Sequence, residues 1–108
     1  MKDFELNEIE ETLRDMDEEC LVFIDTDYEV GLRNYGDDYY GAGAEFSELA
    51  EMSNEELEKQ DIIACIYMSG YEICDTLVAS EDNSELIDEI IDLCEKVGEE
   101  LKGDEDNE

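Results

Sequence analysis

The chain has 108 residues, of which 36 are Asp or Glu, six are Lys or Arg and none is His, so its formal net charge at pH 7 is −30. Contacts with nucleic acid or an anionic membrane surface need Lys or Arg, so this composition argues against both as ligands. The length fits one domain, and an apolar fraction of 42% supplies a hydrophobic core, which argues against a disordered acidic chain.

The first elements in chain order are a helix and a pair of strands. Apolar residues recur at three- and four-residue steps through Asp3–Glu18, which predicts an amphipathic helix. Cys20–Thr26 is apolar and rich in β-branched and aromatic residues, which predicts a buried strand. An alternating pattern begins at Tyr28 and predicts a second strand, paired with the first through a turn at Asp27.

A glycine- and tyrosine-rich stretch follows the second strand. Asn34–Ala44 holds three glycines and three tyrosines, and we expect a long loop whose tyrosines either cover the core or face a partner. Phe46 begins a short apolar pattern that predicts a helix capped by Ser47 or an earlier residue. Ser53 and Glu56 then form a capping box, which predicts the start of another helix.

The stretch Asp61–Ala79 has the composition of a strand but an apolar period that favours helix. Its apolar residues fall on one helical face, whereas a strand would put Asp75 on the same side as its apolar neighbours two residues away. Gly70 fits the residue that follows a helix C-terminus. We therefore expect helices over Asn54–Ser69 and Glu72–Ala79.

The last element is a helix with one apolar stripe and an acidic outer face, capped by Asn83 or Ser84. Gly103–Glu108 has no apolar side chain, and we expect residues 103–108 to be a disordered acidic tail. The predicted fold class is α+β: a single, predominantly helical acidic domain over residues 1–102, with a small antiparallel β element of two or three strands.

The cysteines and the N-terminal residues indicate the cellular compartment of the protein. Cys20, Cys65, Cys74 and Cys94 lie far apart, without a C-x-x-C pair or a histidine to complete a zinc site, so we expect four buried, reduced thiols. The first residues lead into an acidic segment rather than an apolar signal sequence, and no apolar run reaches the ~18 residues of a membrane span. These features predict an intracellular, reducing location.

Catalytic and metal chemistry are poorly supported. The chain has no His to act as a general base or to activate a nucleophile. Asp25, Asp27 and Glu29 are spaced like the start of an EF-hand loop, but the sixth position is Val30 instead of Gly and the twelfth is Gly36 instead of Glu. We therefore predict no enzyme activity, no cofactor and no specific metal site.

The charge itself predicts a basic partner. Carboxylates one helical turn apart are separated by about 5.4 Å, so an acidic helix face imitates a row of phosphates in charge density rather than in atomic register. Salt adaptation also produces acidic, lysine-poor proteins, but it requires neither four cysteines nor a strongly aliphatic core.

Three short motifs occur in an order that resembles the ArdA antirestriction family. They are Asp27-Tyr28-Glu29, Glu48-Leu49-Ala50 in a predicted helix and Gly70-Tyr71-Glu72 before another predicted helix, within roughly Leu6–Ala79. The resemblance implies a phage, plasmid or transposon protein that imitates bent DNA and occupies the DNA groove of type I restriction-modification enzymes in the bacterial cytoplasm. Unlike the family, the chain lacks a strand-rich, tryptophan-containing N-terminal region and has a C-terminal region reduced to one helix, which leaves monomer and homodimer open.

The leading hypothesis is a DNA-mimic inhibitor of a basic, DNA-binding host-defence enzyme: a type I restriction-modification enzyme or, for an anti-CRISPR, an RNA-guided nuclease. The alternative is an immunity protein or antitoxin that caps one basic nuclease toxin through a compact patch and a few hot-spot residues. The carboxylates expected to replace phosphates lie within or beside the family-like region: Asp25, Asp27, Glu29, Asp37, Asp38, Glu48, Glu51, Glu55, Glu58, Glu72 and Asp75.

Overall fold

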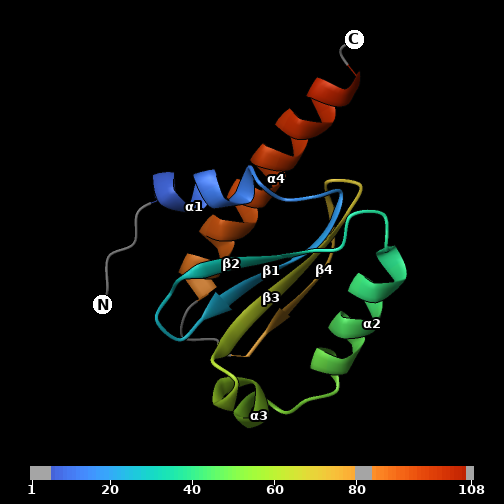
Figure 1. Cartoon of the computed structure of the whole chain (residues 1–108). Helices are drawn as coiled ribbons and strands as arrows, with labels where there is room; N and C mark the ends of the chain where they lie inside the picture. The colour runs from blue at the N-terminus through green and yellow to red at the C-terminus, as the bar shows by residue number, and fades with distance from the viewer. Residues whose placement is uncertain (1–5, 80–83, 107–108) are drawn as a thin grey trace.

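The computed structural model describes residues 6–79 and 84–106. Within these ranges the elements in chain order are α1 (Leu6–Leu13), β1 (Glu19–Asp25), β2 (Val30–Asn34), α2 (Tyr39–Ala50), α3 (Asn54–Lys59), β3 (Ile62–Ser69), β4 (Glu72–Val78) and α4 (Ser84–Asp106). The four strands form one antiparallel sheet in the order β2-β1-β3-β4 (Figure 1). The fold is α+β, but the prediction of a predominantly helical domain with two or three strands is wrong.

The sheet lies between two layers of helices, with α1 and α4 on one face and α2 and α3 on the other (Figure 1). Side chains along β1 alternate between the two layers. Cys20, Val22 and Ile24 pack toward α1 and α4, whereas Leu21 and Phe23 pack toward α2 and α3. Burial on both faces explains the continuous apolar run of β1, and the predicted first hairpin of β1 and β2 is confirmed.

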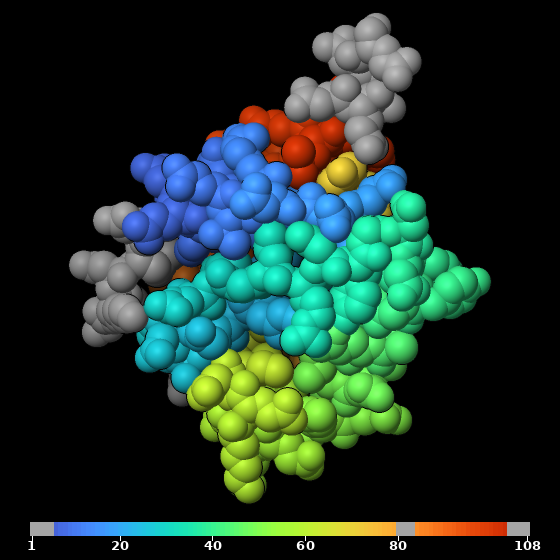
Figure 2. Space-filling model, in the orientation of Figure 1, coloured from blue at the N-terminus to red at the C-terminus, as the bar shows by residue number. Residues whose placement is uncertain are grey.

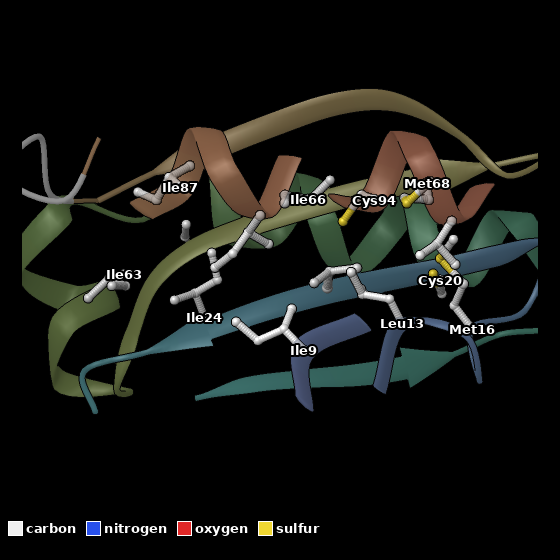
Figure 3. Packing of buried hydrophobic residues seen from close by; sticks show 14 residues of the cluster. Ile9, Leu13, Met16, Cys20, Ile24, Ile63, Ile66, Met68, Ile87 and Cys94 are labelled. Atoms are coloured by element: carbon white, nitrogen blue, oxygen red, sulfur yellow. The ribbon is translucent and has the colours of Figure 1, made fainter. Parts of the chain in front are cut away.

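The larger core lies between the sheet and the α1/α4 layer. Figure 3 shows Ile9 and Leu13 of α1, Ile66 of β3, and Ile87 and Cys94 of α4 within this core. Each fully buried Leu or Ile stabilises the fold by roughly 1.5–3 kcal/mol. The helix α1 ends at residue 13, before the predicted end at residue 18, and the predicted residues 3–5 lie outside the described ranges.

The helix α4 confirms the last predicted helix and begins at Ser84; the alternative cap, Asn83, lies outside the described residues. The helix continues to Asp106, past Gly103, where the tail was expected to begin. Residues 107–108 are not described.

The largest correction concerns Asp61–Ala79, which forms a β-hairpin. The helix α3 starts after Ser53, whose predicted role as N-cap is confirmed, but it ends at Lys59 instead of continuing to residue 69. Gly70 and Tyr71 join β3 to β4 with φ values of 63° and 62°, as a two-residue type I′ turn requires. Gly70 is therefore a hairpin glycine and does not end a helix.

A bulge at Cys74 explains why the apolar period was misleading. The pairing of β3 with β4 shifts by one residue there, so Ile73 packs on the α1/α4 side and Leu77 on the α2/α3 side. Asp75 is exposed because β4 is an edge strand. The objection that a strand would put Asp75 on the same side as both Ile73 and Leu77 was wrong, because the bulge places these two residues on opposite faces.

The stretch predicted as the loop Asn34–Ala44 contains the start of α2. Asp38 is the N-cap, and its Oδ1 atom accepts a hydrogen bond of 3.1 Å from the backbone N–H of Gly41. A Cβ at Gly41 would lie 3.0 Å from the Tyr35 ring, so this glycine permits close packing in the first turn. Of the two predicted alternatives for the cap, Ser47 is wrong because it lies inside the helix, and an earlier residue is confirmed, since Asp38 is the N-cap.

The four cysteines are all free, and three of them are buried. Burial raises the pKa of Cys20, Cys65 and Cys94 to about 12, with smaller contributions from nearby charged groups. Cys74 is exposed on β4, so the expectation of four buried thiols is wrong at this position.

We predict that Ellman's reagent at about pH 8 reacts rapidly with one thiol of the folded chain, that of Cys74, because a reagent needs an accessible thiolate. A Cys74→Ser variant should show no rapid phase, and all remaining thiols should react after denaturation. Equally rapid reaction of Cys65 in the folded chain would contradict the central position of β3.

Gly98 is the point of closest approach between α4 and the β3–β4 turn. A Cβ at this position would lie 2.2 Å from the carbonyl oxygen of Tyr71, whereas a Cβ at Gly103 of the same helix meets open space. We expect Gly98→Ala to lower the free energy of unfolding by about 1–3 kcal/mol through overpacking. Gly103→Ala should be neutral or raise it by up to about 1 kcal/mol. Urea titration of both variants measures the difference, and equal effects would refute this docking of α4.

Candidate functional site

The segment from β1 to the start of β3 carries a dense set of acidic side chains. Twelve carboxylates and two cations lie between Asp25 and Asp61. We call the surface formed by residues 25–61 the α2–α3 surface. Figure 2 shows it as one continuous area, coloured from cyan to yellow-green.

The β1–β2 turn and the end of α3 meet at one end of the sheet. The Oδ1 atom of Asp25 accepts hydrogen bonds of 2.9 Å from the backbone N–H groups of both Asp27 and Glu29. The hydroxyl of Thr26 donates a 3.3 Å hydrogen bond to Oδ1 of Asp61. Asp25 therefore shapes the turn, while Asp27 and Glu29 are exposed at its surface.

The carboxylates of α2 and α3 extend this area along the α2–α3 surface. Glu48 and Glu51 are three residues apart at the end of α2, and Glu55 and Glu58 have the same spacing in α3. All four are exposed, and the ion pairs of the described residues include none of them. These are the carboxylates most available to a partner.

Asp37 and Asp38 lie at the opposite end of α2. Both are exposed, and Asp38 also serves as the helix N-cap. The next two residues, Tyr39 and Tyr40, are exposed by 48% and 79%. Tyr35 packs against the smaller core, as one of the two alternatives expected, whereas Tyr39 and Tyr40 are exposed to solvent.

Two predicted site residues belong elsewhere. Glu72 forms a 3.0 Å ion pair with Lys102 of α4, and Asp75 accepts a hydrogen bond from the backbone N–H of Thr76 on the edge strand β4. The other nine predicted carboxylates lie on the α2–α3 surface. The structure thus brings together most of the predicted set. Glu72 lies on the α4 side, whereas Asp75 lies opposite Tyr67, on the α2/α3 face of the edge strand β4.

A second acidic surface was not among the predicted sites. It consists of the exposed outer side of α4, on the opposite side of the sheet from α2 and α3. The i, i+3, i+4 spacing of its acidic residues was visible in the sequence and was the available signal. Its exposed carboxylates are Glu85, Asp88, Glu89, Asp92, Glu95, Glu99 and Glu100.

The cations near α4 are held in ion pairs. Arg14 contacts Glu10 at 2.8 Å and Glu100 at 2.6 Å, and Lys96 contacts Glu10 at 3.5 Å. The hydrogen bond from Arg14 and the charge of Lys96 lower the pKa of Glu10, which favours the ionised form of this carboxylate. On the α2–α3 surface, Arg33 is paired with Glu45 at 2.6 Å.

A hollow of about 430 Å³ lies between β4 and α4 and is lined by Tyr71, Glu72, Ile73, Glu95, Glu99 and Lys102. It is on the α4 side and shares only Glu72 with the predicted site. Over the described ranges, no group of three or more Cys, Asp or Glu side chains is placed to hold a metal ion. The same ranges contain no helix with the length and apolar character of a membrane span.

Comparison of the chain with protein-family models, with curated proteins and with solved structures finds no match. The resemblance to the ArdA family therefore stays a prediction from short motifs. Asp27-Tyr28-Glu29 lies just after β1, and Glu48-Leu49-Ala50 ends α2. Gly70-Tyr71-Glu72 leads into a strand instead of the expected short helix, which is a further departure from the family pattern.

The density of carboxylates on both sides of the sheet predicts a salt-dependent stability. Added sodium chloride shortens the Debye length to about 10 Å at 0.1 M and screens the repulsion among carboxylates. We expect the melting temperature at pH 7, followed by circular dichroism, to rise by at least about 4 °C, which corresponds to ~1 kcal/mol. The rise should be smaller at about pH 4, where many carboxylates are protonated. A melting temperature that stays constant or falls at pH 7 would contradict the account.

Proposed function

We propose that the chain is a DNA-mimic inhibitor that occupies the duplex-binding channel of a basic host-defence enzyme. It acts by binding and performs no chemistry of its own. The observation that carries the proposal is the α2–α3 surface, where twelve carboxylates stand against two cations, one of them already paired with Glu45. Such a surface attracts the Lys and Arg side chains that otherwise contact phosphates.

The number of charges on this surface matches that of a short piece of duplex DNA. Twelve carboxylates less two cations leave ten net charges, which correspond to about 17 Å of B-form DNA, or roughly five base pairs, at one charge per ~1.7 Å of helix axis. The whole chain carries more charge, but α4 presents its carboxylates on the other side of the sheet, so one channel cannot contact both surfaces at once. The mimic is therefore shorter than the net charge alone implies.

The preferred target is a type I restriction-modification enzyme, on the strength of the ArdA-like order of motifs. An RNA-guided nuclease also has a basic channel for a duplex, and an anti-CRISPR role uses the same surface. In either case the chain would come from a phage or another mobile element and act in the cytoplasm of the bacterial host, as a monomer or a homodimer.

A second candidate is an immunity protein or antitoxin that caps one basic nuclease toxin. The observation that favours it is the exposed pair Tyr39 and Tyr40 beside Asp37 and Asp38, since aromatic side chains on a compact patch are typical of interface hot spots. A toxin recognises such a patch specifically, whereas a DNA channel contacts an extended row of charges.

The test compares two variants of equal charge in binding to a purified type I restriction-modification enzyme. The α2–α3 variant replaces four exposed carboxylates by amides, at Glu48, Glu51, Glu55 and Glu58. We expect the unmodified chain to lose affinity at least about tenfold between about 50 and 200 mM salt, and duplex DNA to displace it. The α2–α3 variant should bind at least about tenfold more weakly at low salt and show a shallower salt dependence.

The matched control, the α4 variant, changes the same number of exposed carboxylates to amides, at Asp88, Glu89, Asp92 and Glu95. It should bind nearly as well as the unmodified chain, because long-range attraction alone changes and the contact surface stays intact. Failure of duplex DNA to compete, or affinity independent of salt, would overturn the mimic. An equal loss in both variants would show that net charge, and not the α2–α3 surface, determines binding.

A further inference from the structure

We propose that Tyr39 and Tyr40, together with Asp37 and Asp38, form a contact site for arginine side chains of the partner. We call these four residues the tyrosine patch. The inference rests on the proposed function in one respect, that the partner is basic. It adds a chemical preference for guanidinium over ammonium, because the flat guanidinium stacks on the rings in addition to the bidentate pairing that carboxylates alone offer.

The first observation is exposure. Tyr40 is 79% exposed and Tyr39 is 48% exposed, and both values exceed those of the other exposed large apolar residues of the described chain, Leu6 at 42% and Val78 at 38%. Two adjacent aromatic rings in solvent contribute little to the core. Large, rigid aromatic side chains of this kind supply contact area in interfaces at low cost in conformational entropy.

The second observation is that both tyrosines project from a capped helical turn. Both tyrosines lie in the first turn of α2, which Asp38 caps through its hydrogen bond to the backbone N–H of Gly41. The close approach of Gly41 to Tyr35 packs this turn against the rest of the surface. The ring centroids of Tyr39 and Tyr40 are 4.7 Å apart with an interplanar angle of 43°, so the pair presents two differently oriented faces.

The third observation is the charge around the rings. Asp37 and Asp38 directly precede the tyrosines and are exposed. The N-terminal end of a helix repels cations, but the carboxylate of Asp38 at the N-cap offsets that partial positive charge. A guanidinium can therefore contact a carboxylate at its edge while its flat face lies on a tyrosine ring.

The same combination already exists within the chain. The guanidinium of Arg33 lies 5.6 Å from the centroid of the Phe23 ring and forms an ion pair of 2.6 Å with Glu45 of α2. This group packs on the same side of the sheet as the tyrosine patch. A ring and a carboxylate from this layer thus bind a guanidinium intramolecularly, and the tyrosine patch offers the same two partners to an external arginine.

Two synthetic peptides of equal length and equal charge test the proposal, one arginine-rich and one lysine-rich, with glycine and serine as spacers. Isothermal titration at about 0.15 M salt measures their affinities for the full chain. We expect the arginine peptide to bind at least about threefold more tightly, the size of an exposed cation–π contribution. In a Tyr39→Leu/Tyr40→Leu variant this preference should fall to the level that carboxylates alone provide, because the arginine peptide loses more affinity than the lysine peptide, while the salt dependence stays unchanged.

Two control variants test whether the preference for arginine depends on the aromatic rings and not on the fold or the net charge. A Tyr39→Phe/Tyr40→Phe variant keeps the rings and should keep the preference for arginine. The α2–α3 variant should weaken both peptides by the same factor and leave the preference intact. Circular dichroism should show unchanged helix content in the leucine variant, because Leu is a better helix former than Tyr.

The possible failures are distinguishable. Equal binding of the two peptides by the unmodified chain, or an unchanged preference in the leucine variant, would overturn the tyrosine patch and leave the acidic surface untouched. If neither peptide binds, the proposal of a basic partner falls together with the patch.

Discussion

The burial of β1 and β3 on both faces is the interaction on which the rest of the structure depends. These central strands supply apolar side chains to both cores, and α1 and α4 on one side and α2 and α3 on the other complete them. Among the described residues no polar or charged side chain is fully buried. The charge is therefore carried mainly by the outer sides of the helices, by the turns and by the exposed edge strand β4, where water and salt weaken its repulsion.

This two-sided core divides the acidic residues between opposite surfaces. The α4 side combines a straight acidic helix with cations held in pairs around Arg14, Lys96 and Lys102. The α2–α3 side combines a turn shaped by Asp25 and two short helices with an exposed aromatic pair. Within the described residues, the α2–α3 surface combines dense charge with the two most exposed aromatic rings, Tyr39 and Tyr40, which is why we assign it to recognition of a basic partner.

The sequence predicted the elements whose pattern is local and missed those that depend on neighbours. The first hairpin, the N-cap at Ser53 and the last helix followed from periodicity and capping. The β3–β4 hairpin did not, because the bulge at Cys74 moves Ile73 and Leu77 to opposite faces, and no pattern within β4 reveals a bulge. Asp25 was predicted to bind a partner, and its carboxylate accepts hydrogen bonds from the backbone of its own turn. The sequence held a signal for this role, because an Asp at the start of a turn commonly accepts a hydrogen bond from the backbone N–H two residues later. The exposure of Tyr40 required the structure.

Hydrogen–deuterium exchange of the chain, alone and bound to a purified type I restriction-modification enzyme, would show which surface contacts the partner. We expect slower exchange in the β1–β2 turn, in α3 and in the first turn of α2, with α4 unchanged. Slower exchange confined to α4, with residues 25–61 unaffected, would contradict this expectation.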